Sequence, residues 1–195
     1  MIKAVIFDFD GTITRPHLNF LKIKEEIGMS PTESALLERI YSMPPNRQIR
    51  AMGILVKHEK EAAENADLTH GLQPVLDFLQ RHNIKTALIT RNSRASVETV
   101  LDKFNLCFDD TITRNDCKVK PAPDAVLKIA AKLQTPLESI LLVGDHQLDI
   151  LAGKAAGVQT VLFTSTGSFN DQLETKADYE INSLAELISI IKQQI

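Results

Sequence analysis

The chain has 195 residues, of which 44% are hydrophobic and 24% are charged, and this composition is typical of a soluble globular protein. Its net charge of −3 and its 5% of aromatic residues argue against a nucleic-acid partner. No apolar run approaches the roughly 18 residues of a membrane helix, and the first apolar segment is too short and too acidic for a signal peptide, so we expect a cytoplasmic protein without a membrane partner.

Six short apolar segments predict β-strands, and amphipathic segments separate most of them. The predicted strands cover residues 3–9, 85–90, 110–113, 139–145, 159–164 and 179–182. Their apolar runs are continuous rather than alternating with polar residues, which is typical of strands that are buried on both faces of a parallel sheet.

Amphipathic segments between and after these strands carry apolar residues at helical spacing, and Gly157 is the predicted C-terminal cap of one helix. These predicted helices cover residues 72–82, 93–106, 123–134, 147–157 and 183–195. Alternating strands and helices imply right-handed crossovers. We therefore predict an α/β fold with a doubly wound, Rossmann-like parallel sheet.

One segment, residues 15–67, interrupts this alternation because it contains no convincing strand. It predicts helices at 19–28, at 30–43 with Ser30 as the cap and Pro31 in the first turn, and at 46–66. We expect residues 1–14 and 68–195 to form the core domain and residues 15–67 to form a small helical cap. An insertion after a strand lies above the carboxyl end of that strand, where open α/β sheets bind ligands.

Two carboxylates follow the first predicted strand in the sequence DFDGT. Asp8 and Asp10 are one residue apart, so the pleat of a strand would point both side chains to one face. Two anions this close repel each other unless a cation lies between them, and Mg²⁺ is the cation that prefers carboxylate and phosphate oxygens. A carboxylate aimed at a phosphate can also act as a nucleophile, and Gly11 would let the backbone turn closely past the ligand.

Further polar residues stand at the ends of other predicted strands. Thr90 ends one strand, Lys120 begins KPAPD after the next, Asp145 ends LLVGD, and Asp149 lies four residues further on. Lys118, two residues before Lys120, is the alternative candidate for the catalytic lysine. Because the carboxyl ends of parallel strands share one edge of the sheet, we predict a Mg²⁺–phosphate site there.

The motifs DFDGT, LIT, KPAPD and GDHQLD, in this order, resemble the haloacid dehalogenase superfamily on its phosphatase side. The resemblance covers the whole chain and is closest to the phosphoglycolate-phosphatase-like members, and the helical insertion is similar to the small cap of cap-type I members. It implies that Asp8 is the nucleophile that forms an aspartyl-phosphate, and that Asp10 is the general acid and base.

The resemblance also assigns the remaining residues. Mg²⁺ would be held by Asp8, by the backbone carbonyl of Asp10 and by Asp145, with Asp149 placing the metal shell and Lys120. The phosphoryl group and the leaving group would be bound by the side chains or backbone of Thr90, Arg91, Asn92 and Lys120.

The expected activity is that of a Mg²⁺-dependent phosphatase acting on a small phosphorylated metabolite. Asp10 argues against dehalogenation, because a halide leaving group needs no proton. A phosphomutase acting on a sugar phosphate and a non-catalytic, receiver-like Mg²⁺–phosphate switch remain open alternatives, and the sequence does not indicate an oligomeric state.

Overall fold

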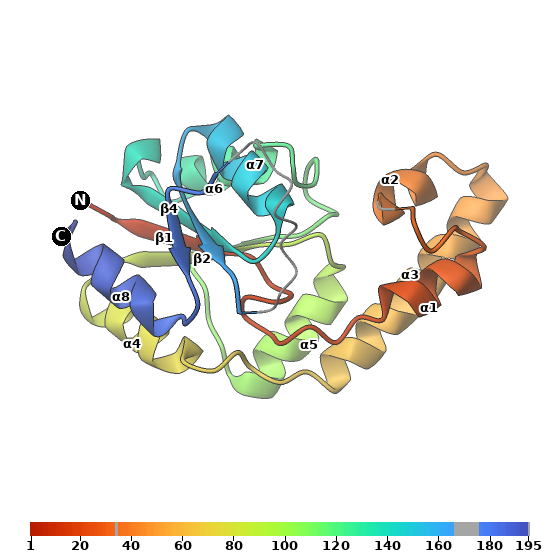
Figure 1. Ribbon diagram of the computed structural model, residues 1–195, viewed down its shortest axis with the longest axis horizontal. Coiled ribbons are helices and arrows are strands. Elements are labelled where there is room, and N and C mark those ends of the chain that lie inside the picture. Colours follow the sequence, from red (N-terminus) through yellow and green to blue (C-terminus); the bar gives the residue numbers. More distant parts are fainter. Residues whose placement is uncertain (34, 166–175, 195) are drawn as a thin grey trace.

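The computed structural model describes residues 1–33, 35–165 and 176–194. Its centre is a parallel sheet of six strands in the order β3-β2-β1-β4-β5-β6 (Figure 1). Each strand lies inside its predicted segment, so the predicted doubly wound α/β fold is confirmed. The strands are β1 (Ala4–Phe7), β2 (Lys85–Ile89), β3 (Asp110–Ile112), β4 (Ile140–Gly144), β5 (Gln159–Phe163) and β6 (Tyr179–Ile181).

The strand order determines where the sheet is expected to bind a ligand. Strand β1 pairs with β2 on one side and with β4 on the other, and Ile6 lies opposite both Ala87 and Leu142. The chain therefore adds β2 and β3 on one side of β1, crosses back, and adds β4, β5 and β6 on the other side. This reversal is a topological switch point, and open α/β sheets bind ligands in the crevice outside the carboxyl ends of such strands.

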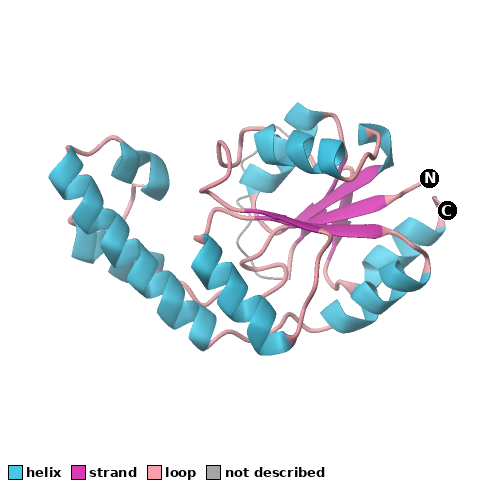
Figure 2. Cartoon of the chain, turned by 180° about the vertical axis from the view of Figure 1, so that it is seen from behind, coloured by secondary structure: helices cyan, strands magenta, loops and turns pink. Residues whose placement is uncertain are grey.

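Helices cover both faces of the sheet (Figure 2). One apolar cluster packs α4 (Leu72–Arg81), α5 (Arg94–Phe104) and α8 (Ala185–Lys192) against one face. A second cluster packs α6 (Asp124–Lys132) and α7 (Gln147–Ala156) against the other, and a short 3₁₀ helix, Leu137–Ser139, precedes β4. All residues of β1 are buried, as the continuous apolar run predicts.

Three helices, α1 (Phe20–Ile27), α2 (Leu36–Tyr41) and α3 (Pro45–Glu64), form a helical lobe that projects beyond the ligand edge of the sheet (Figure 1). The lobe has an apolar cluster of its own, which includes Ile23 and Leu55. The chain enters and leaves through paired segments, because the amide of Thr69 donates to the carbonyl of Ile13 at 2.9 Å.

The predicted start of the second helix is wrong. The structure begins α2 at Leu36, whereas Ser30 and Thr32 belong to a turn in which their hydroxyl oxygens lie 2.9 Å apart. Serine and threonine side chains that bond locally compete with helix formation, which explains why the Ser-Pro signal did not start a helix here. Residue 34, which falls in the predicted helix, lies outside the described residues.

Other helix ends follow the sequence. Gly157 ends α7 with φ +80°, a left-handed conformation that glycine adopts without steric cost, so the predicted cap is confirmed. Within the described parts of the chain, we find no helix with the length and apolar character needed to cross a membrane.

Candidate active site

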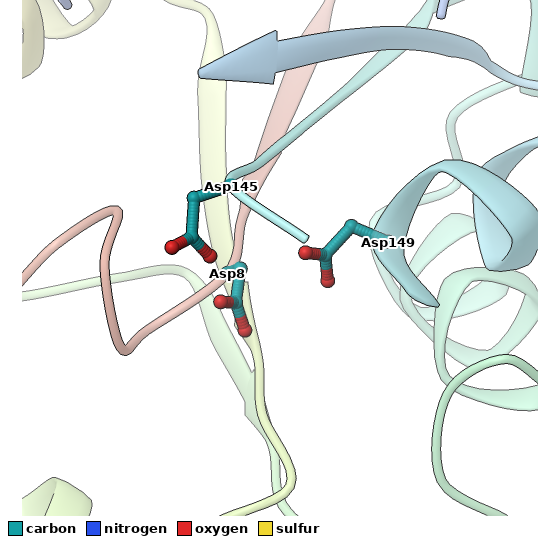
Figure 3. Close-up of side chains that lie close together, drawn as sticks. All are labelled: Asp8, Asp145 and Asp149. Carbon is teal, nitrogen blue, oxygen red and sulfur yellow. The ribbon is translucent and has the colours of Figure 1, made fainter. Parts of the chain in front are cut away.

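Three buried carboxylates meet at the switch point of the sheet. Asp8 directly follows β1, Asp145 directly follows β4, and Asp149 lies in the first turn of α7. Each offers one oxygen to a group in which these atoms all lie within 4.8 Å of one another. Figure 3 shows the carboxyl groups of Asp8 and Asp145 close together, with Asp149 reaching toward them from its helix. The sheet order thus brings together residues that are more than a hundred positions apart in the sequence.

A single lysine is bound to two of these carboxylates. The ammonium group of Lys120 donates a short hydrogen bond to Asp8 and another to Asp149, and its side chain is only 5% exposed. Asp149 is itself held by the amide of His146, which donates to its second oxygen at 3.1 Å. Lys118, the alternative lysine, is exposed. Of the two candidate lysines, Lys120 is therefore the one that lies at this site.

The electrostatics of the group suit a divalent cation. Burial, followed by the charge of Asp149, raises the pKa of Asp8 well above its ordinary value, although Lys120 opposes this. Burial alone would lower the pKa of Lys120, yet Asp149 and Asp8 raise it above its ordinary value. Three carboxylates and one ammonium group leave an excess of buried negative charge. A hard cation with oxygen ligands, such as Mg²⁺, would neutralise that excess, so the residues fit the predicted metal.

Asp10 has a different environment from Asp8. It is half-buried and accepts a hydrogen bond from the side chain of Asn92. Burial, followed by the charge of Glu59, raises the pKa of Asp10 to about 7. A carboxyl group with a pKa near neutrality can both give and take a proton at physiological pH, which is the property that a general acid and base needs.

The turn after β2 supplies polar groups to the same place. Thr90 accepts a hydrogen bond from the amide of Asn92 at 3.0 Å, and its own amide donates to the carbonyl of Ile112. Both side chains are buried at the edge of a cavity. This compact turn can present a hydroxyl and an amide to the oxygens of a phosphoryl group.

All the predicted site residues line one cavity. Its volume is about 440 Å³, within the range of small-molecule sites. Its lining includes every residue predicted from the motifs, namely Asp8, Asp10, Thr90, Arg91, Asn92, Lys120, Asp145 and Asp149. Helices of the lobe form its opposite wall, so the lobe contributes to the site.

Arg91 is placed differently from the other predicted residues. Its guanidinium binds both carboxylate oxygens of Glu38 in α2, at 2.8 and 2.9 Å. Arg91 lines the cavity, but in this structure its guanidinium is used to connect the core to the lobe.

A second ionic contact between core and lobe was not predicted. Glu59 of α3 is 2% exposed and forms a bidentate pair with Arg114, which follows β3. The amide of Ser93 also donates to Glu59, at 3.2 Å. Arg114 could have been noticed as a polar residue just after a strand. Glu59 carries no such signal, because it stands among other charged residues of a long helix.

The chain is similar to known hydrolases in sequence and to solved structures in fold. The family model described as haloacid dehalogenase-like hydrolase matches residues 5–163. An uncharacterised hydrolase of Saccharomyces cerevisiae is 33% identical over 98% of this chain and 91% of its own length. A pyrophosphatase, PpaX, of Bacillus mycoides is 29% identical over 98% of each chain. The crystal structure of a predicted phosphoglycolate phosphatase from Haemophilus somnus superposes with a TM-score of 0.76 at 19% identity, covering 97% of this chain and 98% of that one.

Proposed function

Because the chain belongs to the haloacid dehalogenase-like hydrolase family, we propose that it is a Mg²⁺-dependent phosphatase that hydrolyses a small phosphate monoester through an aspartyl-phosphate on Asp8. One observation supports this most strongly: Asp8 lies against Lys120 and Asp145 at a cavity that also receives Asp10. In the same proposal, residues 1–14 and 68–195 are the core domain and residues 15–67 are the cap.

In the first step, an oxygen of Asp8 attacks phosphorus and the bond between phosphorus and the ester oxygen breaks. Asp10 gives its proton to the departing alkoxide, so the alcohol leaves neutral. Lys120, Thr90 and Asn92 bind the phosphoryl oxygens as charge develops on them. Mg²⁺, when held by Asp8, Asp145 and the Asp10 carbonyl, would supply further positive charge beside these oxygens.

In the second step, water attacks the phosphorus of the aspartyl-phosphate. Asp10, now a carboxylate, accepts a proton from that water, and the bond between phosphorus and the Asp8 oxygen breaks. Inorganic phosphate leaves, Asp8 is restored as a carboxylate, and Asp10 is protonated for the next cycle. Asp149 takes no part in bond making. It holds Lys120 against Asp8.

Hydrolysis of p-nitrophenyl phosphate tests the proposal. We expect many turnovers per protein molecule with Mg²⁺, loss of activity with EDTA, and recovery when Mg²⁺ is restored in excess. Release of at most one equivalent per protein would instead indicate the receiver-like switch. Conversion of a sugar phosphate to an isomer without release of phosphate would indicate the mutase.

A second candidate is hydrolysis of inorganic pyrophosphate, which is favoured by the similarity to PpaX. The chemistry at Asp8 would be the same, with phosphate as the leaving group in place of an alcohol. Measuring phosphate release from pyrophosphate and from monoesters with the same preparation separates the two activities.

The pKa of Asp10 predicts how the rate depends on pH. Asp10 must be protonated in the first step, so kcat/KM for an alkyl phosphate should fall as pH rises through the pKa of about 7. A bound cation lowers this pKa, which would place the fall near or just below pH 7. With p-nitrophenyl phosphate, whose leaving group needs no proton, we expect this fall to be absent. Equal falls above pH 7 for the two esters would contradict the role of Asp10, since only the alkyl ester needs a proton from it.

Gly11 provides a test of the carboxylate geometry. Its φ is +81°, and a Cβ atom there would lie 2.0 Å from an oxygen of Asp145. Gly11→Ala should therefore displace Asp145 and reduce kcat/KM by at least about 100-fold, as expected when a catalytic group is misplaced by an ångström.

Gly53→Ala is the matched control for Gly11→Ala. Gly53 lies in α3, and a Cβ atom there would meet nothing within 4 Å. We expect unchanged kinetics and a gain in stability of about 0.5–1 kcal/mol. If both alanine variants kept full activity, close packing of Gly11 against Asp145 would not matter for catalysis.

A further inference from the structure

The part of the cavity that faces away from the carboxylates is mainly apolar. It is lined by Leu18, Phe20, Leu36, Leu37 and Leu55. All five belong to the lobe or to the segment that leads into it. The site therefore has a charged end on the core, where a phosphoryl group would bind, and a leucine-rich wall opposite.

This wall belongs to the packed interior of the lobe. Leu36, Leu37 and Leu55 are members of its apolar cluster and are each less than 10% exposed. Leu18 packs against the same cluster. A wall that is fixed by its own core is largely formed before a ligand arrives, as small-molecule sites usually are. Phe20 is the exception, because it is 51% exposed at the cavity rim.

Basic side chains around this wall already have protein partners. The guanidinium of Arg91 binds Glu38 at both oxygens, and His17 lies 3.8 Å from Asp67. Lys24 donates to the carbonyl of Pro31 at 3.1 Å. Lys24 is held by a carbonyl and not a carboxylate, so a second anion on the substrate would be drawn to it. For that reason an anionic ester is included in the test below.

The polar residues that line this side of the cavity, His17, Lys24 and Glu59, each already have a protein partner, and the apolar residues of the wall cannot bind hydroxyls. Its leucines and phenylalanine offer no hydrogen bond, so each hydroxyl of a polyol buried against them would lose water without replacement. An apolar body would instead be stabilised by leaving water.

We infer that the preferred substrate is a phosphate monoester of an apolar alcohol, with an aromatic or branched aliphatic body seated against Leu36, Leu37 and Leu55. This inference rests on the proposed phosphatase function and names the class of its leaving group. Sugar phosphates are disfavoured because they place hydroxyls against the leucine-rich wall, and phosphoglycolate and pyrophosphate are disfavoured because they lack the apolar body that this wall would bury.

The experiment compares kcat/KM for 2-phenylethyl phosphate, glycerol 3-phosphate and phosphoglycolate, all esters of primary alcohols, with pyrophosphate alongside. We expect 2-phenylethyl phosphate to be preferred by about 10- to 100-fold, the range given by burial of a phenyl-sized group. A preference for glycerol 3-phosphate, phosphoglycolate or pyrophosphate, or equal values within threefold, would overturn the inference. Hydrolysis of any of the monoesters would leave the proposed function standing. If none of the monoesters were hydrolysed, both the inference and the proposed phosphatase function would be overturned.

Phe20 and Leu21 supply a matched pair of variants. Both are exposed, at 51% and 64%, but only Phe20 lines the cavity. Phe20→Ser should lower kcat/KM for 2-phenylethyl phosphate about fivefold, chiefly through KM, and leave glycerol 3-phosphate within twofold. Leu21→Ser should change neither. Equal effects of the two variants, or of Phe20→Ser on both esters, would contradict an apolar leaving-group site.

Discussion

Asp8→Asn is expected to reduce the turnover of a phosphate monoester by at least about 10⁴-fold, or roughly 5.4 kcal/mol of transition-state stabilisation. The amide has nearly the shape of the carboxylate but is a poor nucleophile, so the aspartyl-phosphate cannot form. The fold should survive. Lys120 keeps its hydrogen bond to Asp149. The substitution also removes one negative charge from the three buried carboxylates, which carry an excess of negative charge. Steady-state kinetics and a thermal melt of the same preparation measure the two effects.

Asp102→Asn is the control for this experiment, since Asp102 is an exposed carboxylate on α5, away from the cavity. We expect its kinetics to match those of the unmodified protein. If Asp8→Asn retained more than about a tenth of normal turnover, the nucleophile would have to be another group. If it lost activity together with its cooperative melt, a second variant, Asp8→Glu, would be needed. That variant keeps the charge but moves the oxygen, and it should be folded and inactive.

Arg114→Met is expected to destabilise the protein by about 3–5 kcal/mol, the cost of leaving a buried charge without its partner. Glu59 is only 2% exposed. It would keep the hydrogen bond from the Ser93 amide but lose its bidentate ion pair with the Arg114 guanidinium. Denaturant unfolding gives the free energy directly. Replacing both partners, with Arg114→Met and Glu59→Leu together, should recover much of the loss, because neither charge is then buried.

Arg94→Met makes the same chemical change at a different kind of ion pair. Arg94 binds Asp116 at 2.7 Å, but the two side chains are 43% and 30% exposed. Exposed pairs contribute about 0–1 kcal/mol, so this variant should lose little stability. Equal losses for Arg94→Met and Arg114→Met would show that burial of the Glu59–Arg114 pair has no special energetic weight.

Much of the fold and the meeting of the carboxylates could be predicted from sequence, because both follow from short-range patterns and sheet geometry. Continuous apolar runs marked β1 and β4 as buried strands, and a polar residue stands directly after each. Once parallel strands are aligned, their carboxyl ends share one edge, so Asp8 and Asp145 were expected at the same edge of the sheet. The sequence did not show that β1 and β4 are neighbours. That came from the strand order.

The contacts between core and lobe were beyond sequence reasoning. Glu59 and Arg114 are 55 positions apart, and nothing in a charged helical segment distinguishes a buried glutamate from an exposed one. The start of α2 was missed because a local turn at Ser30 and Thr32 took priority over a typical helix signal. The leucine-rich wall could not be predicted from the sequence, for a related reason. Its residues have the spacing of an ordinary helix interior, and only the packing shows that one edge of that interior faces a cavity.

The paired segments at the base of the lobe have an evolutionary consequence. The amide of Arg15 donates to the carbonyl of Asp67 at 3.0 Å, and Thr14 and Leu68 form an antiparallel bridge, so the chain leaves the core and returns to it at nearly the same point. Genetic lengthening, trimming or exchange of everything beyond that junction need not disturb the strands that carry Asp8 and Asp145. Descendants of such a gene can acquire a different wall opposite the carboxylates while Asp8, Asp145 and the strands that position them are inherited unchanged.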